Sequence, residues 1–70
     1  MNKNGNSIGN NIKRYRLEHE WTQEELAFRV GTSQPRVSDW EAGVKVPRLG
    51  SLMRIAHALD VRPSVLIDLE

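Results

Sequence analysis

Apolar residues recur at helical spacing along most of the chain, and short polar turns separate the apolar stretches. Over about residues 7–19, Ile8, Ile12 and Tyr15 fall on one stripe of a predicted first helix. Over about residues 48–59, apolar side chains stand at the i, i+3, i+4 and i+7 positions of a predicted fourth helix: Leu49, Leu52, Ile55, Ala56 and Leu59. No strand-like alternation interrupts this pattern, which therefore predicts an all-α fold.

Two short helices joined by a tight turn are predicted over residues 22–43. Thr22 and Glu25 match a capping box, in which the hydroxyl accepts from the amide three residues on and the carboxylate reaches back to the cap. Gly31 follows the last apolar position of this first helix of the pair. A glycine there can adopt the left-handed conformation that ends a helix at the lowest cost.

The second helix of the pair is predicted to begin with Ser33 as N-cap and to carry Pro35 in its first turn, where the missing N–H is tolerated. Val37 and Trp40 form its apolar face, and Gly43 marks its end. A helix, a glycine turn and a second helix are the plan of a helix-turn-helix DNA-binding unit, whose second helix lies in the major groove.

The remaining segments complete a compact five-helix arrangement. Residues 44–48 are expected to form an extended connector, since the residue before a proline avoids the helical region. Pro63 opens a short last helix that is expected to reach about Asp68. We therefore predict one helical domain over residues 7–70, preceded by a flexible, almost entirely polar arm at residues 1–6.

Composition restricts the class of protein. The chain has 70 residues and no cysteine, so neither a disulfide nor a thiolate metal site is available. It has no apolar run of membrane-spanning length and no signal peptide, and it is therefore expected in the cytoplasm. The net charge is only +1, from ten basic and nine acidic residues, which by itself would not identify a nucleic-acid binder. The basic residues are nevertheless clustered, on the first helix and around the second helix of the pair.

Several segments resemble one family of DNA-binding proteins. TQEELA at 22–27, VSDWEAG at 37–43 and Pro47 are similar to the helix-turn-helix family of the lambdoid phage repressors, Cro proteins and bacterial relatives, often called the XRE or Cro/C1 type. IKRYR at 12–16 and IAHAL at 55–59 extend the similarity in both directions. The resemblance implies a lambda-repressor-like fold and a transcription regulator that binds DNA.

The outward face of the second helix of the pair holds the candidates for contacts with bases: Gln34, Pro35, Arg36, Ser38 and Asp39. Glutamine pairs with adenine N6 and N7, and arginine with guanine O6 and N7. The resemblance places Gln34 at a position where phage repressors of this type read bases, so Gln34 is the first candidate and Arg36 the second, with Ser38 and Pro35 beside them. Alternatively, Gln34 is a plain exposed residue and Arg36 contacts a phosphate. Asp39 would repel DNA unless it accepted from a cytosine amino group, and a solvated or Arg36-orienting role is the preferred interpretation.

Other polar residues are candidates for contacts with backbone phosphates. Gln23, at the first position of the first helix of the pair, resembles the family glutamine that binds phosphate at a helix N-terminus. Lys45 and Arg48 lie on the connector, where relatives also contact the backbone. Lys13 and Arg14 lie on the outer face of the first helix. The alternative for these charges is a solvated surface.

Two further expectations depend on the resemblance. Relatives pair Arg and Glu at the positions of Arg16 and Glu41, which implies a partly buried ion pair that fixes how the second helix of the pair is presented; Arg16 is also a candidate for a phosphate contact. Relatives usually have glycine where this chain has Glu20, and that difference bears on the geometry of the first turn.

Two apolar residues near the end of the chain suggest that the protein forms a dimer. Readers of this type normally bind as two-fold dimers, because one recognition helix covers only a few base pairs. Ile67 and Leu69 have no obvious place in the core and are the candidates for a dimer interface. The alternative is that both cover the edge of the fourth helix in a monomer.

An enzyme is not expected. His19 and His57 are far apart in sequence, and no catalytic motif, metal cluster or cofactor motif is present. The leading hypothesis is a sequence-specific regulator of transcription that binds double-stranded DNA, a repressor acting at a palindromic operator as a homodimer. The alternatives are the DNA-binding antitoxin of a toxin–antitoxin pair and a helical protein-interaction module that has lost DNA binding.

Overall fold

Five α-helices make up residues 7–67, the part of the chain that the computed structural model describes. They are α1 (Ser7–Glu18), α2 (Gln23–Val30), α3 (Gln34–Ala42), α4 (Leu49–Leu59) and α5 (Pro63–Leu66). No strand occurs within that range, so the all-α prediction is confirmed. The proposed flexible arm, residues 1–6, and the last residues of the predicted domain, 68–70, lie outside the described residues.

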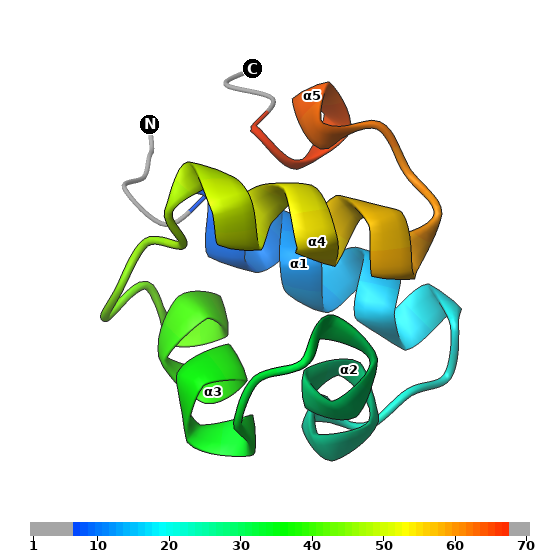
Figure 1. The fold of residues 1–70 in the computed structure, drawn as a ribbon, viewed down its shortest axis with the longest axis vertical. Coiled ribbons are helices and arrows are strands. Elements are labelled where there is room, and N and C mark those ends of the chain that lie inside the picture. Colours follow the sequence, from blue (N-terminus) through cyan, green and yellow to red (C-terminus); the bar gives the residue numbers. More distant parts are fainter. Residues whose placement is uncertain (1–6, 68–70) are drawn as a thin grey trace.

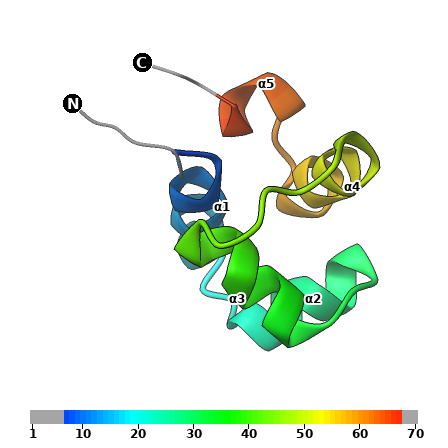
Figure 2. The same ribbon diagram turned by 90° about the vertical axis from the view of Figure 1, so that its left-hand side faces the viewer.

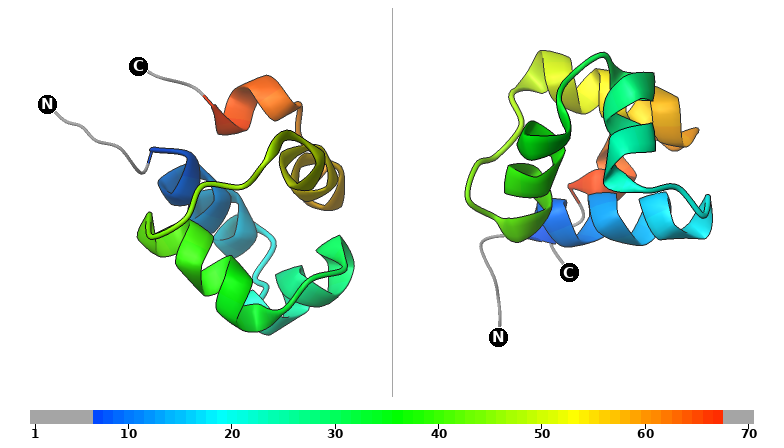
Figure 3. Two further views of the ribbon diagram at one scale, coloured as in Figure 1. Left: turned by 60° about the vertical axis from the view of Figure 1, so that its left-hand side comes forward. Right: turned by 90° about the horizontal axis from the view of Figure 1, so that it is seen from below.

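The helices follow one another in three levels from one end of the molecule to the other. Figures 1 and 2 show α2 and α3 at one end, α5 at the other, and α1 and α4 between them. Seen from the α2–α3 end, the connector between α3 and α4 runs from the C-terminal end of α3, beside the start of α1, to the start of α4 (Figure 3, right). The helix-turn-helix pair thus forms one end of the domain.

Every helix contributes at least one side chain to a single apolar core. The buried apolar residues are Ile12, Leu26, Ala27, Val30, Val37, Trp40, Leu52, Ile55, Ala56, Leu59 and Leu66. Each fully buried Leu or Ile in this set stabilises the fold by roughly 1.5–3 kcal/mol relative to leaving it exposed. The core therefore holds α3 against the rest of the domain from its inner side.

The predicted apolar face of α4 is wrong at its first member, Leu49, which is 73% exposed. Leu49 is the first residue of α4 and shares a flank with Met53, four residues on, which is 51% exposed. That flank lies beside the buried face, which is centred on Leu52 and Ile55. The i, i+4 spacing alone therefore did not distinguish the exposed flank from the buried face. The predicted fifth helix is also shorter than expected, since α5 ends at Leu66.

The helix-turn-helix pair has the predicted hydroxyl caps and glycine ends, but the return bond of the predicted capping box is not found, because the Glu25 carboxylate accepts from Nε of Arg29 at 2.7 Å instead. The hydroxyl of Thr22 accepts from the backbone N–H of Glu25 at 3.0 Å, and the hydroxyl of Ser33 accepts from an amide in the first turn of α3 at 3.3 Å. Gly31 and Gly43 end α2 and α3 in the left-handed conformation, with φ of 87° and 79°. Gly31 and Ser33 therefore fix the two boundaries of the turn between α2 and α3.

Glu20 has the left-handed backbone conformation that glycine adopts most easily. Its φ is +61°, and its backbone N–H donates to the carbonyl of Leu17 at 2.9 Å. Asp60, at the end of α4, also has a φ of +61°. An L-residue in this region costs about 1–2 kcal/mol, so both turns keep their geometry at some expense of stability.

Candidate nucleic-acid interface

The orientation of α3 determines which of its side chains can contact a ligand. Val37, Trp40 and Glu41 are buried, and successive residues are rotated by about 100° around the helix axis. The direction opposite to this buried stripe carries Pro35, which is exposed, and Asp39, which is half-buried. Gln34 and Arg36 then lie on the two flanks, on either side of this outward face.

On one flank, Gln34 is tied to the first residue of α2. Its Nε2 donates to Oε1 of Gln23 at 2.7 Å, and Nε2 of Gln23 donates to Oε1 of Glu41 at 3.0 Å. Because a carboxylate only accepts, Glu41 requires the NH₂ group of Gln23 to face it, and the Gln23 carbonyl is left for Gln34. Gln34 keeps its Oε1 and one N–H for an outside partner.

The network ends in a buried ion pair between α1 and α3. Nε and Nη2 of Arg16 donate to the two carboxylate oxygens of Glu41 at 2.6 and 2.9 Å, and Nη1 donates to the carbonyl of Trp21 at 2.7 Å. The two side chains are only 9% and 4% exposed. All three guanidinium nitrogens are thus engaged inside the domain, so a phosphate contact by Arg16, considered from the sequence, is not supported.

Gly9 forms a second attachment of α3 to α1, and sequence reasoning missed it. A Cβ on Gly9 would lie 2.1 Å from the carbonyl oxygen of Trp40, which is far closer than atoms can approach. The only side chain that fits at this crossing is therefore a hydrogen. The signal was available in the sequence as a glycine inside an otherwise periodic helix, which usually marks a close approach of another backbone.

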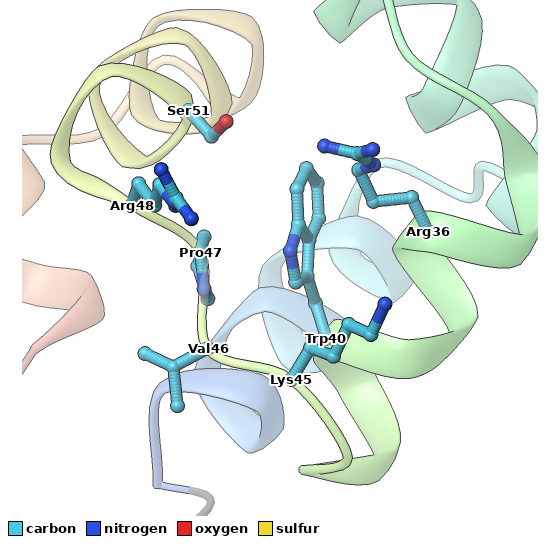
Figure 4. A pocket seen from close by; sticks show the side chains of 7 residues that line it. All are labelled: Arg36, Trp40, Lys45, Val46, Pro47, Arg48 and Ser51. Atoms are coloured by element: carbon cyan, nitrogen blue, oxygen red, sulfur yellow. The ribbon is translucent and has the colours of Figure 1, made fainter.

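On the other flank, α3, the connector and the start of α4 enclose an open pocket of about 330 Å³ (Figure 4). Its lining consists of Arg36, Trp40, Lys45, Val46, Pro47, Arg48 and Ser51. Figure 4 shows Arg36 and Arg48 on either side of the Trp40 ring. The lining contains three cationic side chains and no carboxylate, so its chemistry suits an anion such as a phosphate group.

The remaining predicted residues lie elsewhere. Lys13 and Arg14 are exposed on α1, where Arg14 forms a loose ion pair with Glu18 at 3.7 Å, and neither lines the pocket. Ile67 follows α5 and is 43% exposed, whereas Leu69 lies outside the described residues. The structure therefore brings together the glutamines on one flank and the connector cations with Arg36 on the other.

The described part of the chain has neither a metal-binding cluster nor a membrane-spanning helix. Residues 7–67 contain no group of three His, Asp or Glu side chains placed to hold a metal ion. None of the five helices in that range combines the length and the apolar character needed to cross a bilayer.

Comparisons with known proteins agree with this geometry. Residues 12–66 match the model of the helix-turn-helix family. The chain is 41% identical over 54 residues to the HTH-type transcriptional regulator y4dJ of Sinorhizobium fredii, covering 77% of this chain and 70% of that protein. It is 40% identical over 47 residues to the antitoxin HigA1 of Mycobacterium tuberculosis, covering 67% of this chain and 32% of the antitoxin. The chain thus spans only about a third of the length of some curated relatives.

The fold is also similar to solved structures of DNA-binding proteins. The N-terminal DNA-binding domain of SinR from Bacillus subtilis superposes with a TM-score of 0.86 at 30% identity, covering 93% of this chain and 96% of that domain. The P22 c2 repressor bound to a synthetic operator superposes with a TM-score of 0.84 at 27% identity, covering 90% and 96%.

Proposed function

This chain belongs to the Cro/C1-type helix-turn-helix family of DNA-binding transcription regulators, which are not enzymes, and from that membership we propose that it is a repressor binding a palindromic operator as a dimer. The observation that carries the proposal is Gln34, held at the start of α3 by a hydrogen-bonded network that leaves one donor and one acceptor of its amide available. Occupancy of the operator, in the cytoplasm, would then block transcription.

Base reading is assigned first to Gln34. Adenine presents an N6 donor and an N7 acceptor in the major groove, and a glutamine amide offers the complementary pair when its Oε1 and one N–H are available. The link to Gln23 fixes the orientation of this amide before DNA arrives, so little side-chain entropy remains to be lost on binding. Pro35, on the outward face, and Ser38, between that face and the Gln34 flank, are proposed to lie against neighbouring base edges.

Phosphate binding is assigned to both flanks of α3. Gln23 has a second amide N–H left at the N-terminus of α2, where free backbone amides and the helix dipole favour an anion. On the other flank, Lys45 and Arg48 line the cationic pocket together with Arg36, so we assign Arg36 to a phosphate rather than to a guanine. Lys13 and Arg14 are proposed to act only at longer range.

Dimer formation is proposed to use Ile67, which is exposed, together with Leu69, which lies outside the described residues. If two copies pair there, their recognition helices should enter successive major grooves about 34 Å apart. A surface this small buries little area, so pairing is expected to be weak in free solution and stronger on the operator. The double variant Ile67→Asp with Leu69→Asp should abolish cooperative binding to a full palindrome while sparing half-site binding. A parent-like result would place the interface elsewhere, for example on the exposed Leu49 and Met53 flank of α4.

The experiment that tests the function is selection of binding sites from random duplexes at two salt concentrations. An enriched inverted repeat is expected, with affinity that falls as salt rises because phosphate contacts release counterions. If no sequence is enriched even at low salt, DNA reading fails as the function. The chain would then be a protein-interaction module on the same scaffold.

An antitoxin role is the second candidate, favoured by the similarity to HigA1. It is compatible with operator binding, and it requires in addition a protein toxin that this chain neutralises. Depletion of the protein from its host distinguishes the two, since loss of an antitoxin arrests growth whereas loss of a simple repressor only raises transcription of its target. Normal growth after depletion would contradict the antitoxin role.

A further inference from the structure

Asp39 occupies the outward face of α3 near its centre. It lies roughly opposite the buried stripe of Val37, Trp40 and Glu41, in the sector that also contains Pro35. In a helix that enters the major groove by this face, the Asp39 carboxylate approaches the base edges themselves rather than the phosphates on either side.

Nothing in the described part of the chain neutralises this carboxylate. The acidic side chains that form ion pairs are Glu18, Glu25 and Glu41. No ion pair links Asp39 to Arg36, the partner expected from the sequence, and Arg36 instead lines the pocket with Arg48. The Arg36-orienting role considered from the sequence is therefore not supported.

Asp39 also does little for the helix that carries it. It stands in the second half of α3, towards the C-terminal end, where the helix dipole disfavours a negative charge. Its backbone carbonyl accepts from the amides of Val44 and Lys45, but any residue supplies that carbonyl. A carboxylate that stabilises neither the helix nor an ion pair, on a surface meant for a polyanion, points to a role in recognition.

The chemistry of a carboxylate selects one base. An ionised carboxylate has acceptors only, so it requires a donor on the base edge, and guanine and thymine present acceptors there. Adenine offers its N6 amino group but places the N7 acceptor beside it, against the second carboxylate oxygen. Cytosine offers its N4 amino group with no neighbouring acceptor in the major groove.

We propose that Asp39 is a specificity-determining residue that accepts a hydrogen bond from the N4 amino group of a cytosine in each operator half-site. The inference rests on the proposed DNA-reading function and names one of its base contacts. At other sequences the carboxylate finds no donor and is repelled by the DNA, so Asp39 lowers affinity for wrong sites more than for the right one.

The test is parallel site selection with the parent protein, Asp39→Ala and Asp39→Asn, with Glu24→Gln as control. Glu24 is an exposed carboxylate on α2, so the control removes the same charge away from the outward face of α3. In the parent we expect one position at which cytosine is preferred by roughly 5- to 100-fold. Asp39→Ala should lose that preference alone and bind non-specific DNA more tightly. Asp39→Asn should prefer adenine there, because asparagine pairs with adenine N6 and N7.

The outcomes separate the inference from the proposed function. If the parent enriches a palindrome and Asp39→Ala enriches the same bases at every position, Asp39 does not read a base and the inference is wrong. If Glu24→Gln changes base preference as Asp39→Ala does, the effect is only electrostatic and the inference is equally wrong. If the parent enriches no sequence, the proposed function fails and the cytosine contact with it. Thermal melts should show that all variants are folded, with Asp39→Ala no less stable than the parent, because it removes a charge that the helix dipole disfavours.

Discussion

The two flanks of α3 are built in opposite ways. On the Gln34 flank, each polar group is fixed by the next, from Gln34 through Gln23 to the buried pair of Glu41 and Arg16. On the Arg36 flank, cationic side chains surround an open pocket with no carboxylate among its lining. The difference suits the two tasks proposed for the flanks, because reading a base edge requires a defined geometry, whereas holding a phosphate requires mainly positive charge.

Two ion pairs with nearly equal N–O distances differ in the same way, since one is buried inside the domain and the other is exposed to solvent. Arg16–Glu41 has a closest N–O distance of 2.6 Å and is buried, while Arg29–Glu25 has 2.7 Å and side chains that are 46% and 41% exposed. Distance therefore does not determine what a pair contributes. Burial does, because removing one partner inside the domain leaves the other charge without water or a counterion.

The largest expected effect comes from breaking the buried pair. Glu41→Ala should lower the free energy of unfolding by about 3–5 kcal/mol, because Arg16 would remain buried and unpaired. In a domain of this size each kcal/mol shifts Tm by roughly 4–8 °C, so a thermal melt measures the loss easily. A Tm close to that of the parent would mean that water reaches the Arg16 guanidinium and that the ion pair does not organise α3.

Gly9→Ala should produce the next largest loss, by forcing α1 and α3 apart at their closest crossing. A methyl group 2.1 Å from a backbone oxygen cannot be relieved by a rotamer change, so the cost should be about 1–3 kcal/mol or more. Gly50→Ala in α4 is the matched control, because a Cβ there meets nothing within 4 Å. That change should stabilise the fold by roughly 0.5–1 kcal/mol through helix propensity, and a loss in both variants would refute the steric argument.

Gln34→Ala should weaken binding to the selected operator by about 1–3 kcal/mol and relax preference at one base position, with little change on non-specific DNA. Gln23→Ala should relax the same position, because it removes the acceptor that orients Gln34, and it should in addition weaken all duplexes through its own phosphate contact. Titrations of both single variants and the double variant measure the coupling. If operator and non-specific affinities fall equally in Gln34→Ala, Gln34 only positions the helix.

Lys45→Ala should weaken all duplexes similarly and leave every base preference intact. One phosphate contact fewer should reduce the slope of log K against log salt by roughly one unit. Titrations at several salt concentrations give this slope directly. An unchanged slope would remove Lys45 from the phosphate-binding set and weaken the case for the pocket as an anion site.

The smallest effect is expected from the exposed ion pair. Glu25→Ala should cost less than about 1 kcal/mol, because water solvates Arg29 as soon as its partner is removed. Comparing its melt with that of Glu41→Ala tests the effect of burial at nearly equal N–O distance. Equal losses in the two variants would show that burial is not the deciding factor.

Features that depend on neighbouring residues in the chain could be predicted from the sequence. The Thr22 and Ser33 caps and the glycine helix ends at Gly31 and Gly43 involve groups only a few residues apart, and the structure has all of them. The positive φ of Glu20 was not predicted: the resemblance showed only that relatives have glycine at this position, and nothing in a glutamate itself favours that conformation.

Features that depend on how helices cross could not be predicted in this way. Leu49 fits the apolar period of α4, yet it is the first residue of that helix and remains exposed. Gln23 and Gln34 were predicted as separate contacts, and only the packing of α2 against α3 brings their amides within 2.7 Å. The same holds for Gly9, whose role depends on a carbonyl of α3.

The positions of the two tryptophans have a consequence for optical measurements. Trp40 lines the cationic pocket, so a phosphate group bound there should alter the polarity around its indole and hence its emission. Trp21 does not line that pocket; its ring stacks with the His19 ring, at 4.3 Å between centroids, and contacts the Arg29 guanidinium, at 4.1 Å from the ring centroid. Its fluorescence should therefore follow the integrity of the fold rather than occupancy of the pocket. The chain thus carries two intrinsic optical probes, one for each process, and substituting Trp21 by phenylalanine would isolate the one that senses DNA.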